Sequence, residues 1–342
     1  MAESKILDII IPAYDAHNTI GKTLGSIMNQ SYLDRVRVTI VNDGGTPYNT
    51  IVTSFSRYID VRTIDMPSNR GPGVARQFGV DHTDCKYIMF CDADDLIGGD
   101  CFAIEQMIKT IEYTECDILI NDFIDQRYIP ETEELQNVRV SGDLVWMHGK
   151  IYRRKSLLDN NIKFHPTLRT NEDFYFNQTC YSRLSKIEVS GILGYTWLYH
   201  PKSITHSDNY DILGYEGWYE ALSTHLRECN ELYSLHKYPI RITEDYINYH
   251  TAHGITLGFL EYNEFITKYE KNLCERFLSF LDDYYDHIFR DRNTIYDLSG
   301  YLEGSYANNR NVDGRGFIHP PIMGLSQFIQ MLEDRWQAHH MA

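Results

Sequence analysis

Residues 87–100, "YIMFCDADDLIGGD", run from an apolar segment directly into Asp92, Asp94 and Asp95. The apolar half predicts a buried strand, and carboxylates crowded at its end are costly unless a positive group joins them. If strand geometry continues, Asp92 and Asp94 point to the same side. Paired carboxylate oxygens suit Mg²⁺ or Mn²⁺. A solvated acidic turn is the simpler alternative, and the surrounding sequence has to decide between the two.

The first 125 residues alternate short apolar runs with amphipathic stretches. Five runs are typical of buried parallel strands, at residues 6–12, 36–42, 61–65, 87–92 and 117–123. The intervening stretches predict helices, with Asn18 and Asp100 as N-caps of two of them and a third over 72–82. This alternation predicts a doubly wound α/β sheet, whose ligands bind at the carboxyl ends of the strands.

Four of the predicted strands end in unusual polar segments. These are Pro12-Ala13-Tyr14-Asp15, Asn42-Asp43-Gly44-Gly45, Asn69-Arg70-Gly71-Pro72-Gly73 and the aspartate motif at 92–95. Because the carboxyl ends of parallel strands meet at one edge, we expect all four to face one crevice. That convergence favours a metal site at Asp92 and Asp94 over a solvated turn. Asp95 either orients this site or begins the next segment.

A second acidic pair, Glu172-Asp173, lies in "RTNEDFYFNQ". Asn171 is predicted as an N-cap, which puts both acids in the first turn of a helix, where they meet the helix dipole favourably. That structural role is sufficient by itself. The functional alternative is a general base aimed at a substrate hydroxyl. His200 and His206, just after the last predicted strand of the α/β domain, are candidates to complete a metal site.

Two nucleotide-binding motifs fail on inspection. Gly21-Lys22-Thr23 resembles the end of a P-loop, but position 16 is Ala rather than Gly, and the stretch has a helical pattern. Gly71-Pro72-Gly73 does not continue as G-x-G-x-x-G, because residue 76 is Arg. The sequence therefore disfavours a P-loop enzyme and a dinucleotide-binding fold.

Composition narrows the class of protein. The 342 residues are 43% hydrophobic and 23% charged, with a net charge of −16. This field disfavours nonspecific binding to nucleic acid or anionic membranes. The sequence has no run of 18 apolar residues, so it predicts no membrane span, and its N-terminus lacks a signal-peptide pattern. Seven scattered cysteines form no C-x-x-C pair, so we expect a reducing cytoplasm rather than a disulfide framework.

The character of the chain changes after about residue 208. We interpret 1–208 as the α/β domain and 209–342 as a mainly helical region, with long helical patterns near 212–235, 243–270, 273–291 and 324–338. Residues 125–145 are predicted as a loop or a short antiparallel excursion, 150–160 and 172–183 as helices, and 186–200 as a β-rich piece. The helical region would shape the acceptor side or an oligomer interface, alternatives that the sequence leaves open.

Five segments together resemble glycosyltransferase family 2, whose members have a GT-A fold. They are "IIIPAYDAHNTIGKTLGSIMNQSY", "VTIVNDGGT", "NRGPGVARQFGV", "MFCDADD" and "GKIYRRKSLLDNNIKFHPTLRTNEDFYF", in the family's order over about residues 6–206. The chain departs from the pattern at Asn42 and Gly45 of the D-D-G-S turn and at Gln77 of the A-R-N motif. These departures put the identity of the donor base in doubt, but they remove no group that the chemistry needs.

The resemblance implies an inverting, metal-dependent transferase that moves a sugar from a nucleotide-diphosphate donor, with a UDP-sugar as the first expectation, to an acceptor hydroxyl. Asp173 would be the catalytic base and Glu172 its support. Residues implied in nucleotide-sugar binding are Pro12, Ala13, Tyr14, Asp15, Asp43, Asn69, Gly71, Arg76, Asp92, Ala93 and Ser203. Mn²⁺ or Mg²⁺ would be held by Asp94, Asp92 and His206, with Thr205 nearby.

Several rival functions stay open at this point. A nucleotidyltransferase would need a Gly-rich loop after the first strand, and a HAD-type phosphatase would carry its aspartates after the first strand rather than the fourth. A non-catalytic nucleotide-sugar-binding module has no reason to keep both Asp94 and Asp173. The acceptor would be a cell-surface glycan or its precursor. Glycosylation of a modified DNA base, as by phage-type enzymes, is the alternative that the charge of −16 disfavours.

Overall fold

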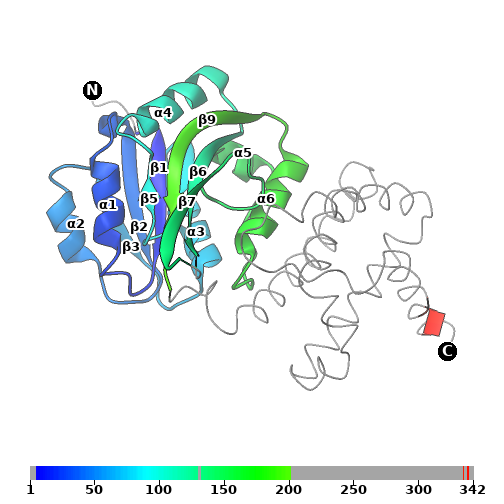
Figure 1. The fold of residues 1–342 in the computed structure, drawn as a ribbon, viewed down its shortest axis with the longest axis horizontal. Helices are drawn as coiled ribbons and strands as arrows, with labels where there is room; N and C mark the ends of the chain where they lie inside the picture. The colour runs from blue at the N-terminus through cyan, green and yellow to red at the C-terminus, as the bar shows by residue number, and fades with distance from the viewer. Residues whose placement is uncertain (1–4, 130–131, 202–333, 335–336, 339–342) are drawn as a thin grey trace. The chain divides into compact units, whose positions relative to one another are not determined.

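The computed structural model describes residues 5–129 and 132–201, together with 334, 337 and 338 (Figure 1). The chain divides into two compact units, Met1–Ala221 and Leu222–Ala342. The predicted boundary at 208/209 and the helices predicted beyond it lie outside the described residues, except that 334, 337 and 338, within the helix predicted at 324–338, are helical. Within the described part, no helix combines the length and the apolar character needed to cross a membrane.

The first half of the described part is the predicted strand–helix alternation. Its elements are β1 (Leu7–Ala13), α1 (Ile20–Met28), the 3₁₀ turn η1 (Leu33–Arg35), β2 (Val36–Asn42), α2 (Asn49–Phe55), β3 (Val61–Asp65), α3 (Pro72–Asp81) and β4 (Tyr87–Phe90). The predicted strands 36–42 and 61–65 are confirmed at both ends, and β1 and β4 differ from prediction by one or two residues. Apolar, β-branched runs and amphipathic helices therefore behave here as their patterns indicate.

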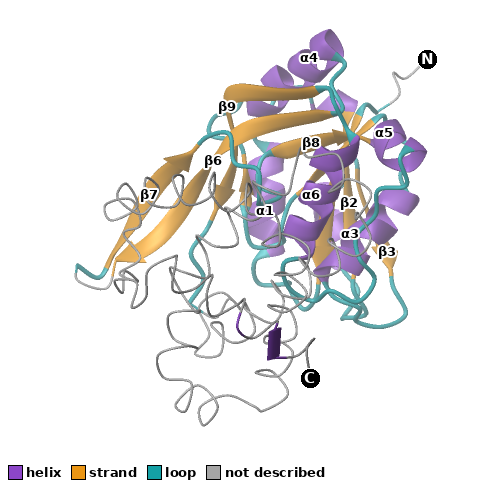
Figure 2. Ribbon diagram, turned by 90° about the vertical axis from the view of Figure 1, so that its right-hand side faces the viewer, coloured by secondary structure: helices purple, strands orange, loops and turns teal. Residues whose placement is uncertain are grey.

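The second half is mixed. It comprises β5 (Leu96–Ile97), α4 (Ala103–Thr114), β6 (Ile118–Ile129), β7 (Glu134–Val140), β8 (Lys150–Arg153), α5 (Arg154–Asp159), α6 (Glu172–Arg183) and β9 (Ile187–Trp197). The predicted antiparallel excursion after 125 is confirmed, because β6 and β7 pair antiparallel from Phe123/Val140 to Ile129/Glu134. Figure 2 shows that β6 and β7 extend together away from the helices as a two-stranded hairpin.

Three details of the prediction are wrong. The helix expected from 150 begins only at Arg154, because residues 150–153 pair as β8 between β4 and β6. Asn18 is not the N-cap of α1; that position is Thr19. Asp100 is not the N-cap of α4 either, since Phe102 precedes that helix, and the Asp100 Oδ1 instead accepts the Phe102 N–H at 2.8 Å in a turn.

The nine strands found in the described residues form one sheet, ordered β3-β2-β1-β4-β8-β6-β9-β5 with β7 paired to β6. The first four strands are parallel, whereas β8 runs antiparallel to both of its neighbours. Ala13 lies opposite Asn42, and Asn42 lies opposite Asp65, so three parallel strands end at one level. The predicted doubly wound mixed sheet is confirmed, and its carboxyl edge gathers the polar segments.

Both faces of the sheet are covered. One core layer joins alternate residues of β1, such as Leu7 and Ile9, to the apolar stripes of α1 and α4. On the other face, Phe90 of β4 packs edge-on against Phe164 and Phe176, whose rings stack 4.1 Å apart. This aromatic cluster fixes α6 against the sheet, and α6 carries the second acidic pair at its first turn.

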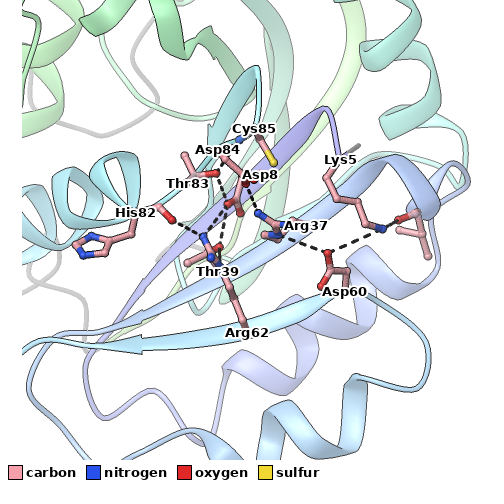
Figure 3. A network of polar contacts seen from close by, with 11 residues as sticks. Lys5, Asp8, Arg37, Thr39, Asp60, Arg62, His82, Thr83, Asp84 and Cys85 are labelled. Carbon is pink, nitrogen blue, oxygen red and sulfur yellow. Dashed lines mark hydrogen bonds and ion pairs between the residues drawn. The ribbon is translucent and has the colours of Figure 1, made fainter. Parts of the chain in front are cut away.

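A separate polar network lies near the amino ends of the strands, away from that edge (Figure 3). The fully buried Asp8 accepts hydrogen bonds at Oδ2 from Thr39 Oγ1 at 2.9 Å and Thr83 Oγ1 at 2.6 Å, and Arg62 Nη2 lies 3.6 Å away. Burial raises the pKa of Asp8 despite these partners. The network ties β1, β2 and β3 to the segment after α3.

Candidate active site

The end of β1 turns sharply outward. Ala13 is buried and Pro12 is half-buried, whereas Tyr14 and Asp15 are exposed, and Asp15 has a left-handed φ of +49°. The Tyr48 hydroxyl accepts the Ala16 N–H at 2.9 Å, which holds the turn. The side chains predicted to line a base pocket therefore lie at the carboxyl edge of the sheet, with the Tyr14 ring presented to solvent.

The end of β2 organises the neighbouring loop. Asp43 is buried, and its two carboxylate oxygens accept the backbone N–H groups of Arg70 at 2.7 Å and Gly71 at 2.8 Å. Gly71 has a φ of +89°, a conformation that favours glycine. Asp43 thus fixes the loop that starts α3, while Asn69 stays exposed and accepts a bond from Arg169 Nη1 at 3.1 Å.

The family departure at Asn42 has a local explanation. The Asn42 side chain accepts the Gly45 N–H at 3.0 Å and donates through Nδ2 to Asp65 Oδ1 at 2.8 Å. An aspartate at this position would place a second carboxylate against Asp65, and like charges at that distance repel. Asparagine keeps the turn and avoids the repulsion.

Arg76 is the centre of the site. From α3 its Nη2 donates to Asp92 Oδ1, and its Nη1 donates to Glu172 Oε1, both at 2.6 Å. Burial opposes the charged guanidinium, but the carboxylates of Asp92, Glu172 and Asp173 outweigh it and keep the pKa of Arg76 above its usual value. One buried cation therefore joins the loop after β4 to the first turn of α6, and the two carboxylates that it contacts are far apart in the sequence.

Close approach of the two helices depends on Gly73. A Cβ at this position would lie 2.8 Å from Cγ of Glu172 and 3.1 Å from its Cβ, too close for any side chain without movement. The glycine in "GPGVAR" is thus explained by packing between α3 and α6 rather than by phosphate binding.

The D-x-D loop presents two carboxylates of different character. Asp92 has 37% of its side chain exposed; burial opposes its ionisation, but Arg76 outweighs burial and lowers the pKa. Asp94 is 45% exposed, and burial together with the nearby Asp92 raises its pKa. Ala93 between them is buried. Asp94 thus bears unfavourable negative charge, which a bound cation would relieve.

Asp95 does not simply begin the next segment. It is 1% exposed, and it accepts hydrogen bonds from the Tyr195 hydroxyl at 2.6 Å and the Leu198 N–H at 2.9 Å. The same hydroxyl accepts the Asp92 N–H at 3.1 Å. Tyr195 of β9 therefore clamps the loop, and burial with the charges of Asp92 and Asp94 raises the pKa of Asp95 well above its usual value.

Glu172 and Asp173 occupy the first turn of α6, as predicted, with Asn171 at the N-cap position in a left-handed conformation. Glu172 is buried against Arg76, while Asp173 is half-buried and accepts the Phe174 N–H at 2.8 Å. Burial and the charge of Glu172 raise the pKa of Asp173 to about 7. A carboxylate with that pKa is suited to accept a proton near neutral pH.

The predicted histidines divide into two groups. His200 lies beside the loop, with Nε2 3.1 Å from the Asp94 carbonyl oxygen and 3.8 Å from its Oδ2. His206, Ser203 and Thr205 lie outside the described residues.

His148 was not predicted, because its segment "MHGKIY" carries no recognisable ligand spacing. In the structure one of its ring nitrogens and single oxygens of Asp92 and Asp95 all lie within 4.8 Å of one another.

The comparisons with known proteins agree with this arrangement. The sequence model of glycosyl transferase family 2 matches residues 8–174. A poly(ribitol-phosphate) β-glucosyltransferase of Bacillus spizizenii is 27% identical over 56% of this chain and 32% of its own length. The poly(ribitol-phosphate) β-N-acetylglucosaminyltransferase TarS of Staphylococcus aureus Mu50 is 24% identical over 73% of this chain and 45% of its own.

Glycosyltransferase GlyA of Streptococcus pneumoniae is 27% identical over 45% of this chain and 21% of its own length, so the chain spans less than half of each of these relatives. Residues 1–349 of S. aureus TarS, solved with UDP-GlcNAc, superpose with a TM-score of 0.63 at 17% identity, over 98% of this chain and 92% of that one. This likeness confirms the GT-A fold. Residues 8–174, just under half of the chain, therefore carry the sequence pattern of glycosyl transferase family 2.

Proposed function

We propose that this chain transfers a sugar from a nucleotide-diphosphate donor to an acceptor hydroxyl, with inversion at the anomeric carbon. The observation that carries the proposal is the shared contact of Arg76 with Asp92 and Glu172. It places the acidic loop that would face the donor diphosphate beside the carboxylate pair that would serve the acceptor. The match of residues 8–174 to the model of glycosyl transferase family 2 supports the same reaction class.

The donor would bind along the carboxyl edge of the sheet. The exposed ring of Tyr14, with Pro12, Ala13 and Asp15, would flank the base. Asp43 already accepts two backbone bonds, but each carboxylate oxygen retains a lone pair for a base N–H. UDP-sugars are the first donors to test, because TarS has been solved with UDP and with UDP-GlcNAc.

A divalent cation, Mn²⁺ or Mg²⁺, fits the acidic loop. Asp94 is half-exposed, has hard oxygen donors and bears charge that Asp92 makes unfavourable. Asp92 and Asp94 would hold the ion, with His200 or His206 as neighbouring candidates. When bound, it would neutralise charge that develops on the leaving diphosphate.

Asp173 would act as the base. Its pKa of about 7 lets it take the proton of an acceptor hydroxyl as that oxygen attacks the anomeric carbon, on the side opposite the leaving diphosphate. Glu172, held by Arg76, keeps the first turn of α6 in place and raises the basicity of Asp173. A single displacement inverts the configuration, so an α-linked donor would give a β-linked product.

The acceptor is proposed to be a hydroxyl of a cell-surface glycan or of its precursor. Two of the relatives are named as transferases to poly(ribitol-phosphate), which makes a polyol-phosphate chain the first acceptor to test. A cytoplasmic location is proposed because the five cysteines of the described residues are all unpaired. Assembly as a homo-oligomer stays a prediction from the sequence.

The test is a thermal-shift screen of nucleotide-sugars with and without Mn²⁺, followed by transfer assays with the responding donor. We expect one donor class to raise the melting temperature in a Mn²⁺-dependent way. Asp173→Asn should bind that donor normally and fail to transfer its sugar. If no donor responds, the proposed function is wrong. If Asp173→Asn transfers the sugar at the normal rate, the assignment of Asp173 as the base is wrong.

A further inference from the structure

The proposed reaction gives no role to two buried side chains beside Asp92, those of Asp95 and His148. We propose that Asp92, Asp95 and His148 form a divalent-cation site on the inner side of this loop, with the His148 imidazole as a ligand. The half-exposed Asp94, the expected partner of a donor-bound metal, is not a member of this set. The inner site is proposed for the chain without nucleotide, so it does not depend on the proposed function.

The separations suit a single ion. One ligand atom from each of the three side chains lies within 4.8 Å of the other two. Oxygen and nitrogen ligands about 2.1 Å from an ion are about 3.0 Å apart when adjacent and about 4.2 Å apart when opposite in an octahedral site. Small side-chain rotations therefore bring all three atoms to an ion. Asp92 still has Oδ2 for this purpose, because Oδ1 receives the bond from Arg76.

His148 supplies an independent indication of a ligand. The residue is 7% exposed, and its buried Nδ1 has no hydrogen-bond partner among the residues that the structure describes. Buried polar atoms in folded proteins almost always have a partner, so an unpartnered nitrogen on a ring that lies beside two carboxylates needs an explanation. Burial lowers the pKa of His148 to about 4, so the ring is neutral and its lone pair is available to a metal.

The ring is also held in a fixed orientation. It stacks against Tyr195 and packs against Trp197, each with a centroid distance of 4.9 Å, and it meets the edge of Phe123 at 5.0 Å. The next residue, Gly149, has a φ of +69°, and a Cβ added to it would lie 3.1 Å from the carbonyl oxygen of Asn121. The segment that carries His148 therefore passes close to β6. A ligand pre-oriented in this way loses little conformational freedom when it binds an ion.

The charge around Asp95 points the same way. Among the described residues no cationic side chain pairs with it; its partners are a hydroxyl and an amide N–H. The two nearby buried cations are committed elsewhere: Arg76 to Asp92 and Glu172, and Lys150 to Asp143 at 3.2 Å. A buried carboxylate without a cation is costly, and a divalent ion shared with Asp92 would supply the missing charge.

The ligand types define the class of ion. Two carboxylates with one imidazole favour first-row transition metals such as Mn²⁺, Fe²⁺, Co²⁺ or Zn²⁺ over Mg²⁺ and Ca²⁺, which prefer oxygen alone. Mn²⁺ is the probe of choice because its electron spin resonance reports both affinity and directly bonded nitrogen. Asp92 belongs to both sets of ligands, so the experiment is done without nucleotide, when no diphosphate draws the ion toward Asp94.

The test titrates the metal-depleted full chain with Mn²⁺ and records spin-echo modulation from ¹⁴N. We expect one Mn²⁺ per chain with nitrogen coupling in the wild type. His148→Phe, which keeps the ring packing, should lose the coupling and weaken Mn²⁺ binding at least tenfold. The same substitution at His200 or His206 is the matched control and should leave the coupling in place. Asp95→Asn should weaken Mn²⁺ binding while the fold, followed by circular dichroism, is kept.

Three outcomes would overturn the proposal: no nitrogen coupling in the wild type, coupling that persists in His148→Phe, or coupling lost instead in the His200 or His206 variant. If His148→Phe does not fold, unchanged Mn²⁺ affinity in Asp95→Asn refutes the site equally. Binding of the nucleotide-sugar by His148→Phe is measured in parallel. Its retention would show that a failed metal proposal leaves the proposed function intact.

Discussion

The shared ion pair of Arg76 allows a quantitative test. Arg76→Met keeps the length of the side chain and removes the charge, which leaves Asp92 and Glu172 without their cation. Removing one partner of a buried pair costs about 3–5 kcal/mol, because the remaining charge stays buried. Glu172 is buried, but Asp92 is 37% exposed and recovers part of its hydration. We therefore expect a loss near the lower limit, about 3 kcal/mol, in the free energy of unfolding.

A second substitution isolates the contribution of Glu172. In Arg76→Met/Glu172→Gln the buried carboxylate is gone, so the double variant should be about 1–2 kcal/mol more stable than the sum of the two single losses predicts, within the range of coupling measured for contacting pairs. Urea denaturation followed by circular dichroism provides the measurement. Arg169→Met is the matched control: this arginine is exposed, donates to Asn69 only through one 3.1 Å bond and should change stability by less than about 0.5 kcal/mol.

Arg76→Met should also change the pH dependence of catalysis. Arg76 lowers the pKa of Asp173, which stands at about 7 in its presence. Without the guanidinium that pKa rises, so the acidic limb of the pH–kcat profile should move to higher pH. A Met variant as stable as the wild type, additive losses in the double variant, or a limb that moves to lower pH would each refute the role given to Arg76.

Three further predictions follow from the same region. Asp173→Asn should lower kcat by about 10²–10⁴-fold. Because the folded wild type binds a proton at Asp173 up to pH about 7, its stability falls as pH rises from about 4 to 7, and the variant should lose this component. Gly73→Ala should lower the free energy of unfolding by about 1–3 kcal/mol, since the new Cβ would lie 2.8 Å from Glu172 Cγ. Gly21→Ala is the control: its new Cβ would have no neighbour within 4 Å, so this variant should be as stable as the wild type or more stable in the same urea denaturation assay. Tyr195→Phe removes the hydroxyl that joins Asp92 and Asp95 and should cost about 1–3 kcal/mol, against no measurable change for the exposed Tyr113→Phe.

What the sequence predicted well depends on local pattern. The strands at 36–42 and 61–65 are short apolar runs bounded by polar residues, and nothing in the tertiary structure competes with that tendency. The helix at 172–183 was also predicted at both ends. The caps Asn18 and Asp100 failed because such side chains stabilise turns as readily as helix starts, and Asp100 forms a turn before α4.

The remaining features depend on contacts between distant residues. Lys150–Arg153 is a strand because it fits between β4 and β6, and no local signal distinguishes it from the helix that follows. His148 lies close to the D-x-D loop because the strand that follows it, β8, pairs between β4 and β6. Asp95 was ambiguous because its partner Tyr195 lies 100 residues away. The sequence thus predicted that these carboxylates would lie in one region, but not which contacts hold them in place.

The position of Arg76 explains why these carboxylates can coexist. Asp92, Asp94 and Asp95 on one side and Glu172 and Asp173 on the other would repel across a small space, and within the part of the chain that the structure describes the guanidinium of Arg76 contacts both groups. Arg76 compensates Asp92 and Glu172 directly, which leaves Asp94 and Asp173 as the half-buried acids with raised pKa values. A cation at the loop would relieve the charge on Asp94, and the proton that Asp173 takes from the acceptor hydroxyl in the proposed transfer would relieve the charge on Asp173. The uneven distribution of one positive charge therefore divides five acids between holding the site together and carrying out its chemistry.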